Sequence, residues 1–207
     1  MISVKWTPAE KKTLTALKKP QQIQAHLDGT SYSSEPIYRS PRSVMRDNRA
    51  HCFDGAMFAA AALERIGFEP LLLDLRAVRD DDHVLAVFQD DGCWGSIGKS
   101  NFVGLRGRDP VYRSLRELAM SYFEPYFNSD RERTLRSFSA PVKLKKFEKL
   151  NWRTEDEAMD AIADALNAAK HEALISEAQA KRLWSVDERT WAGHTVGTDS
   201  AGLWKPK

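Results

Sequence analysis

Two residues of this sequence have types and positions suited to covalent catalysis, Cys52 and His83. Cys52 opens an alanine-rich stretch in which apolar residues recur every three or four positions, so we predict a buried helix that begins near Cys52 and ends at Gly67. Unpaired N–H groups and the dipole at a helix N-terminus favour a thiolate, which is a good nucleophile. A cysteine in this position can equally be a small buried apolar residue. The helix start therefore indicates a candidate nucleophile.

His83 is the candidate base for that thiol. It opens a predicted strand that follows Asp80-Asp81-Asp82, 31 residues after Cys52. An imidazole can accept a thiol proton near pH 7. If a sheet packs on the cysteine helix, the start of this strand can lie at the helix N-terminus. A histidine after three aspartates is also typical of a solvated loop, and this alternative stays open.

The elements that must position these two residues follow from periodicity and turn signals. Helices are predicted over about 7–17, 21–27 and 115–127, and a loop or short edge strand over 30–42. Strands are predicted over 70–76, 83–88, 93–97 and 135–144, and 102–113 is predicted to be a surface loop. A helix followed by adjacent strands favours an α+β fold, with an antiparallel sheet packed on a central cysteine-bearing helix.

The chain is predicted to divide into three parts. Residues 1–150 form the α+β domain. Residues 151–190 form an α-helical hairpin, which begins at the acidic helix start Thr154-Glu155-Asp156-Glu157 and has its second helix over about 176–184. Residues 191–207 lack a clear periodicity and are predicted to be an irregular tail.

Composition limits the class of protein. The chain has 31 basic and 29 acidic residues and a net charge of +2, which favours neither nucleic acid nor a membrane surface as a partner. Two cysteines in 207 residues do not make a disulfide framework. The start of the chain lacks the apolar run of a signal peptide. We therefore expect a cytoplasmic protein, and no motif calls for a cofactor.

Taken together, these features resemble the transglutaminase-like, cysteine-protease-like superfamily over about residues 7–105. The resemblance rests on two N-terminal helices and a loop before Cys52, on Gly67-Phe68-Glu69-Pro70 before a strand, and on His83 opening the next strand. An Asp-Gly turn leading to Trp94 completes it. The resemblance implies that Cys52 is a nucleophile, that His83 is its base, and that an acid on the next strand orients the imidazole.

The third position departs from the family pattern. The orienting acid would fall at about Gly98, and residues 95–101 contain no carboxylate. Ser100, like Ser96, would share a strand face with position 98, and Asn101 could act as an amide orienter after a one-residue bulge. A backbone carbonyl could also orient the imidazole, or the ring could be left free. The predicted catalytic set is Cys52, His83, Ser100 and Asn101.

The resemblance implies acyl chemistry through a cysteine thioester, which is either hydrolysis of an amide or transfer to an amine. The substrate would be a peptide, a protein or a small amide or acyl compound. Because the orienting acid is missing, a catalytically inactive binding module with the same cleft is the alternative.

Other chemistry-bearing motifs are weaker. Gly98-Lys99-Ser100 lacks the glycine that a phosphate loop needs five residues earlier, because Cys93 occupies that place. The cysteines and histidines lack the paired spacing of zinc ligands, so no metal site is predicted. A basic cluster, formed by Lys99, Arg106, Arg108 and Arg113, is either a solvated face or a site for an acidic substrate or acyl carrier.

Overall fold

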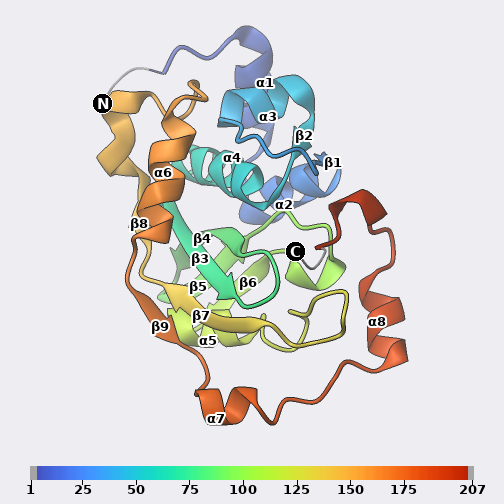
Figure 1. Cartoon of the computed structure of the whole chain (residues 1–207). Coiled ribbons are helices and arrows are strands. Elements are labelled where there is room, and N and C mark those ends of the chain that lie inside the picture. Colours follow the sequence, from blue (N-terminus) through green and yellow to red (C-terminus); the bar gives the residue numbers. More distant parts are fainter. Residues whose placement is uncertain (1–3, 205–207) are drawn as a thin grey trace.

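The computed structural model describes residues 4–204 and has an α+β fold, as predicted (Figure 1). Its helices are α1 (Pro8–Ala16), α2 (Pro20–Asp28), α3 (Pro41–Asp47), α4 (Cys52–Arg65), α5 (Leu115–Met120), α6 (Ala158–Asn167), α7 (Glu177–Ala180) and α8 (Glu188–His194). The 3-10 helices are η1 (Val103–Leu105), η2 (Leu144–Leu150) and η3 (Ser200–Gly202). Cys52 is the first residue of α4, as predicted.

Most strands of the described residues belong to one antiparallel sheet. The strands are β1 (Ser31–Tyr32), β2 (Arg49–Ala50), β3 (Leu71–Ala77), β4 (His83–Asp90), β5 (Cys93–Ile97), β6 (Arg108–Tyr112), β7 (Leu135–Ser139), β8 (Val142–Lys143) and β9 (His171–Ala173). Within residues 4–204 the main sheet has seven strands in the order β6-β5-β4-β3-β7-β9, and β8 pairs with β3 beyond the end of β7. β1 and β2 form a separate parallel pair.

The sheet separates two hydrophobic cores. Alternate residues of β4 point to opposite faces, as in any strand. Val84, Ala86 and Phe88 pack with α4 in the first core, and Leu85 and Val87 pack with the α5 region in the second. Figure 1 shows α4 on one side of the sheet and α5 on the other. This division decides which side chains of β4 can face Cys52.

Local sequence signals explain why α4 lies where it does. Its alanines are buried, and their small side chains allow the helix backbone to approach the sheet closely. The helix ends at Arg65, and Gly67, two residues later, adopts a φ of 101° that glycine tolerates without strain. The N–H of Phe68 then donates to the carbonyl of Leu63 at 3.1 Å, which satisfies an end carbonyl of the helix.

Within residues 102–127, two predicted elements differ from the structure. The stretch 102–113, predicted to be a loop, contains β6, which pairs with β5 through Trp94–Tyr112 and Ser96–Arg108. Its glycines and arginines obscure the strand signal. The helix predicted over 115–127 ends at Met120, because residues 121–125 continue as turns.

The segment predicted as a helical hairpin is instead helix, strand and short helix. β9 follows α6 and pairs with β7 at the edge of the sheet, and α7 spans only Glu177–Ala180. α6 adds Met159, Ile162 and Leu166 to the first core. Residues after 150 therefore share the core and the sheet of the preceding domain. The apolar face of α6 packs into the first core, and β9 pairs with the free edge of β7.

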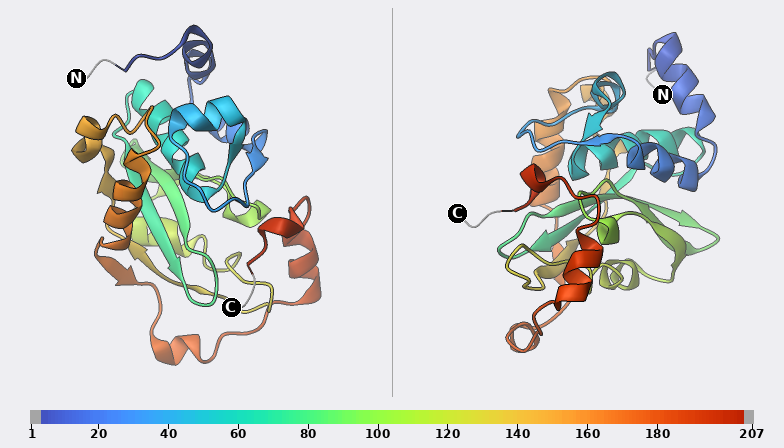
Figure 2. Two further views of the ribbon diagram at one scale, coloured as in Figure 1. Left: turned by 45° about the horizontal axis from the view of Figure 1, so that its top comes forward. Right: turned by 90° about the vertical axis from the view of Figure 1, so that its right-hand side faces the viewer.

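The tail predicted to be irregular, 191–207, contains the last turn of α8 and the whole of η3. Figure 2 shows this red segment passing the end of the sheet and returning towards the N-terminal helices. Residues 205–207 of the predicted tail lie outside the described residues.

Candidate functional site

Cys52 is held in place by hydrogen bonds around the start of α4. His51 caps the helix, because its Nδ1 accepts a hydrogen bond from the N–H of Phe53 at 3.2 Å. The carboxylate of Asp54 accepts a hydrogen bond from the N–H of His51 at 3.3 Å. This reciprocal capping fixes the direction of the first turn and of the Cys52 side chain.

Asp54 also ties the helix start to the loop before α3. It is fully buried, and its Oδ1 accepts a hydrogen bond from the N–H of Arg39 at 2.8 Å. The guanidinium of Arg39 lies 3.6 Å from the same carboxylate. Burial raises the pKa of Asp54 to about 7, and the N–H donors and Arg39 only partly oppose this.

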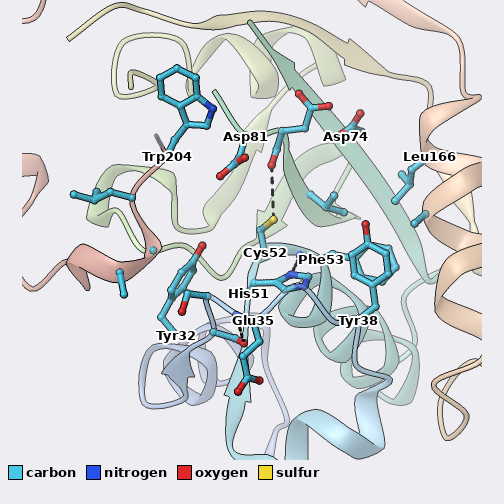
Figure 3. A pocket seen from close by; sticks show the side chains of 18 of the residues that line it. Tyr32, Glu35, Tyr38, His51, Cys52, Phe53, Asp74, Asp81, Leu166 and Trp204 are labelled. Atoms are coloured by element: carbon cyan, nitrogen blue, oxygen red, sulfur yellow. Dashed lines mark hydrogen bonds between the residues drawn. The ribbon is translucent and has the colours of Figure 1, made fainter. Parts of the chain in front are cut away.

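The thiol of Cys52 lies at the floor of a pocket of about 620 Å³. Figure 3 shows its sulfur directed away from α4, and Sγ lies 3.7 Å from the carbonyl oxygen of Asp82, to which the thiol donates. Tyrosines, carboxylates and the end of the chain surround it, including Tyr32, Tyr38, His51, Asp74, Asp81 and Trp204. Burial raises the pKa of the Cys52 thiol to about 11, although the N–H groups of Val84 and Phe53 act in the opposite direction.

The three aspartates before β4, Asp80, Asp81 and Asp82, form the loop whose Asp82 carbonyl accepts the hydrogen bond of the Cys52 thiol. Asp80 accepts a hydrogen bond from the hydroxyl of Thr134 at 2.6 Å, and Asp82 accepts one from the N–H of Ala77 at 2.8 Å. The hydroxyl of Tyr126 donates to the carbonyl of Asp81 at 2.7 Å. The loop that carries the thiol's acceptor is therefore fixed on several sides.

His83 is a buried residue of β4 and not a loop residue, since only 4% of it is exposed. Its Nε2 lies 2.9 Å from the carbonyl oxygen of Leu105. Because a carbonyl oxygen only accepts hydrogen bonds, Nε2 must carry the proton and Nδ1 is left with a free lone pair. Burial lowers the pKa of His83 to about 4, so the imidazole is neutral at pH 7.

Cys52 and His83 lie on different faces of the sheet near the start of β4. The imidazole lies on the α5 face of the sheet, with its centroid 6.3 Å from that of Tyr122 and 6.4 Å from that of Tyr126. The thiol lies on the α4 side. Both residues line a cavity of about 60 Å³ at the strand end, but the hydrogen bonds of thiol and imidazole go to Asp82 and Leu105 instead of joining the two side chains.

Ser100 and Asn101, the predicted orienting residues, line the same small cavity but hydrogen-bond elsewhere. The hydroxyl of Ser100 accepts from the N–H of Phe102 at 3.0 Å. The side-chain amide of Asn101 forms two hydrogen bonds with the backbone of Asp199, each of 2.8 Å. The orienting role predicted for them is therefore taken by the backbone carbonyl of Leu105, which sequence patterns do not reveal.

Ser96 is also engaged elsewhere. Its hydroxyl lies 2.7 Å from the hydroxyl of Tyr122 on the second-core side of the sheet.

Gly98 lies where the resemblance places the orienting acid. A Cβ atom at this position would be 3.3 Å from Nε2 of His83. It would also lie 3.2 Å from the carbonyl oxygen of Leu105 and 2.7 Å from Cδ2 of Leu85. The glycine therefore leaves room for the Leu105 carbonyl to approach the imidazole, and a side chain at position 98 would compete for that room.

The predicted basic cluster is mostly used inside the fold. The ammonium group of Lys99 donates to the carbonyls of Leu27 and Thr30 at the end of α2, at 3.0 Å and 2.5 Å. Arg106 forms an ion pair with Asp28, and the guanidinium of Arg108 lies over the ring of Tyr122 at 4.0 Å. These contacts argue against the acidic carrier site considered from the sequence.

Two groups of this pocket were not found by sequence reasoning. Asp74 of β3 lies on the same face as Cys52, and its Oδ2 is 3.0 Å from Nε2 of His171 on β9. The two residues are 97 positions apart, and no local pattern links them. The end of the chain was missed as well, because residues 201–204 line the pocket although their sequence has no periodicity.

The described residues 4–204 hold neither a metal-binding cluster nor a membrane-spanning helix. In this part of the chain, no group of three or more His, Cys, Asp or Glu side chains is arranged to hold a metal ion. Over the same residues, no helix is both long and apolar enough to cross a membrane.

No protein-family model matches the sequence, and a comparison with curated proteins gives no match either. The resemblance to the transglutaminase-like superfamily therefore remains a hypothesis, and the function must be argued from the site itself.

Proposed function

We propose that this protein carries out acyl chemistry through a thioester on Cys52, with His83 as the general base. The observation that carries the proposal is the small cavity at the start of β4, which both residues line, with Nε2 of His83 held by the carbonyl of Leu105. That hydrogen bond leaves Nδ1 as the basic nitrogen.

In the proposed reaction, Nδ1 of His83 removes the thiol proton while the sulfur bonds to the acyl carbon of the substrate. The bond from that carbon to its leaving nitrogen or oxygen then breaks, and the imidazolium returns the proton to the leaving group. The resulting thioester is attacked by water or by an amine. This second nucleophile loses its proton through the same imidazole, and the cysteine leaves as the thiol.

The substrate class is an amide or acyl compound, either on a peptide or protein or as a small molecule. A pocket of about 620 Å³ beside the thiol is large enough for such a group. Because burial raises the pKa of Cys52 to about 11 and lowers that of His83 to about 4, the resting pair is neutral at pH 7. The proton must therefore move during the attack and not before it.

The proposal is tested by acylation of the full chain with p-nitrophenyl acetate near pH 8, followed by mass mapping of both cysteine peptides. We expect an acetyl group on Cys52 and release of nitrophenol, and both are lost in Cys52→Ala. His83→Gln keeps an N–H donor for the Leu105 carbonyl but lacks a base, so it should slow acylation about a hundredfold.

Cys93→Ser serves as the matched control, because it removes the other free thiol of the chain. Acylation of Cys52 should be unchanged in this variant. Acylation of Cys52 that proceeds equally fast in His83→Gln, or that is absent from the parent chain, contradicts the proposed function.

A second candidate function is ligand binding in the same pocket without covalent chemistry. Two observations favour it. Burial keeps the thiol of Cys52 protonated. The group that holds His83 is a backbone carbonyl and not an acid, and a carbonyl carries no full charge to stabilise an imidazolium. In that case neither cysteine would be acylated preferentially, and His83→Gln would leave the acylation rate unchanged.

A further inference from the structure

The last described residues of the chain border the pocket of Cys52. We call residues 198–204 the C-terminal strap. Its residues 201–204 line the larger pocket beside the thiol, and Gly202 and Trp204 also line the small cavity that Cys52 shares with His83. Figure 3 shows Trp204 on the opposite side of the pocket from His51. The strap therefore borders both spaces through which a substrate would reach the sulfur.

Asn101 attaches the start of the strap to the body of the protein. Its Nδ2 donates to the carbonyl of Asp199 and its Oδ1 accepts from the N–H of Asp199, both at 2.8 Å. The hydroxyl of Thr198 adds a hydrogen bond to the backbone carbonyl of Asn101 at 3.3 Å. One side-chain amide thus replaces the pairing that a neighbouring strand would provide.

The end of the strap rests on two further contacts. The hydroxyl of Ser129 donates to the carbonyl of Trp204 at 3.1 Å. Gly202 lies flat against Tyr32, because a Cβ atom at position 202 would be 2.5 Å from Cε1 of that ring. A side chain here would push the strap away from the wall that Tyr32 forms.

The strap is attached weakly compared with the elements around it. Its residues belong to neither hydrophobic core, and Ala201 is exposed while Gly202, Leu203 and Trp204 are half-buried. α8, which precedes it, is anchored separately by His194 between Phe102 and Phe127, with ring centroids 4.8 Å and 4.4 Å apart. Segments with few buried apolar contacts open at a small free-energy cost while the rest of a protein stays folded.

We propose that the C-terminal strap is an autoinhibitory cover of Cys52 that must leave its place before an acyl substrate can reach the sulfur. The autoinhibitory role rests on the proposed function, because only a catalytic thiol can be inhibited. The docking of the strap can be measured without any turnover, because it determines how large a reagent can approach the thiol.

The test compares alkylation of Cys52 by iodoacetamide, a small reagent, with alkylation by fluorescein maleimide, a bulky one. Two variants of the full chain are compared with the parent. Asn101→Ala removes the two hydrogen bonds to Asp199, and Gly202→Val adds a side chain that clashes with the ring of Tyr32. Both variants should raise the ratio of bulky to small labelling at Cys52 about tenfold, because Asn101→Ala loses two hydrogen bonds and the side chain added by Gly202→Val pushes the strap away from Tyr32. Using the ratio removes any effect of a changed thiol pKa, which would alter both rates alike.

Asn167→Ala is the matched control. Asn167 lines the same pocket. Its hydrogen bond with Arg76, at 3.2 Å, is made by its backbone carbonyl, so the substitution leaves that bond in place. The labelling ratio should not change in this variant, and the labelling of Cys93 within each sample serves as the internal reference.

An unchanged ratio in both strap variants, with the circular dichroism spectrum of the parent, overturns the inference. A ratio that rises equally in Asn167→Ala also overturns it, because general loosening of the pocket would then explain the effect. If the ratio rises as expected but Cys52 is not acylated by p-nitrophenyl acetate in any variant, the strap is established and the proposed function fails. The two outcomes are therefore separable.

Discussion

At the scale of single residues, burial and not the helix dipole decides the state of the thiol. A charge at a helix N-terminus gains about 0.3–1 kcal/mol, which corresponds to less than one pH unit in a pKa. Burial acts against the thiolate of Cys52 more strongly than this, and the outcome is a pKa of about 11. The sequence argument from the helix start alone predicts the opposite direction.

This result predicts the pH dependence of Cys52 alkylation in the parent chain. The rate with iodoacetamide should be low at pH 7 and should rise about tenfold per pH unit towards the pKa of about 11, because only the thiolate reacts. Mass mapping of the Cys52 peptide from pH 6 to 10 measures it. A rate that levels off below pH 8 would show an activated thiolate instead.

Position 98 offers a second prediction at the same scale. Gly98→Asp and Gly98→Asn crowd Leu85 and the Leu105 carbonyl alike, so both should lower the free energy of unfolding by ~1–3 kcal/mol. Only Asp adds a charge beside Nε2 of His83. The pKa of His83 should therefore be higher in Gly98→Asp than in Gly98→Asn by about one pH unit or more.

An NMR titration of the His83 imidazole in both variants measures that difference. Equal titration curves would mean that the carboxylate does not face the ring, and the placement of the family acid at position 98 would be wrong.

At the scale of elements, α6 and β9 show how the residues after 150 support the site. Ile162 of α6 is fully buried in the core that α4 also occupies. β9 brings His171 to Asp74, which lies in the pocket of Cys52. The C-terminal part of the chain therefore contributes both packing and a buried polar pair to the environment of the thiol.

This packing predicts the cost of truncating a side chain of α6. Ile162→Ala should lower the free energy of unfolding by ~2–4 kcal/mol, because it leaves a cavity in the first core. Asp164→Ala, on the exposed side of the same helix, should change it by less than ~0.5 kcal/mol. Urea unfolding of both variants compares them, and similar midpoints would indicate that α6 is not packed as described.

At the scale of the whole molecule, α8 joins the end of the chain to the region around the site. His194 is 6% exposed, and its Nε2 is buried without a hydrogen-bond partner within the described residues. Burial lowers its pKa to about 4. The unfolded chain takes up this proton near pH 6.5 and the folded chain only near pH 4, so the free energy of unfolding falls as the pH drops through this window.

His194→Phe should remove that part of the pH dependence, because the ring is kept and the titrating nitrogens are lost. Between pH 7 and pH 5, the stability lost by the parent should exceed that lost by His194→Phe by ~1–2 kcal/mol. Thermal unfolding at both pH values measures the difference. A parallel loss in both proteins would exclude His194 as its source.

The sequence by itself determined the local elements around the nucleophile. The alanine-rich period, Gly67 and the Asp-Gly turn predicted the cysteine helix and the strand pair 83–88 and 93–97, because helix caps and tight turns depend on residues close together in the chain. The α+β class followed from the same order of elements. The resemblance, and not the local pattern, placed position 98 beside the imidazole, and a Cβ atom there would be 3.3 Å from Nε2 of His83.

Only the tertiary structure decided the chemistry of the site. Which face of β4 carries His83, and the carbonyl of Leu105 that orients it, depend on the packing of two cores on one sheet. The engagement of Asn101 by Asp199 and the pairing of Asp74 with His171 each join residues almost 100 positions apart. Hydrogen bonds over such separations and the burial that sets a pKa arise from the folded arrangement in space, and no local pattern of residue types encodes them.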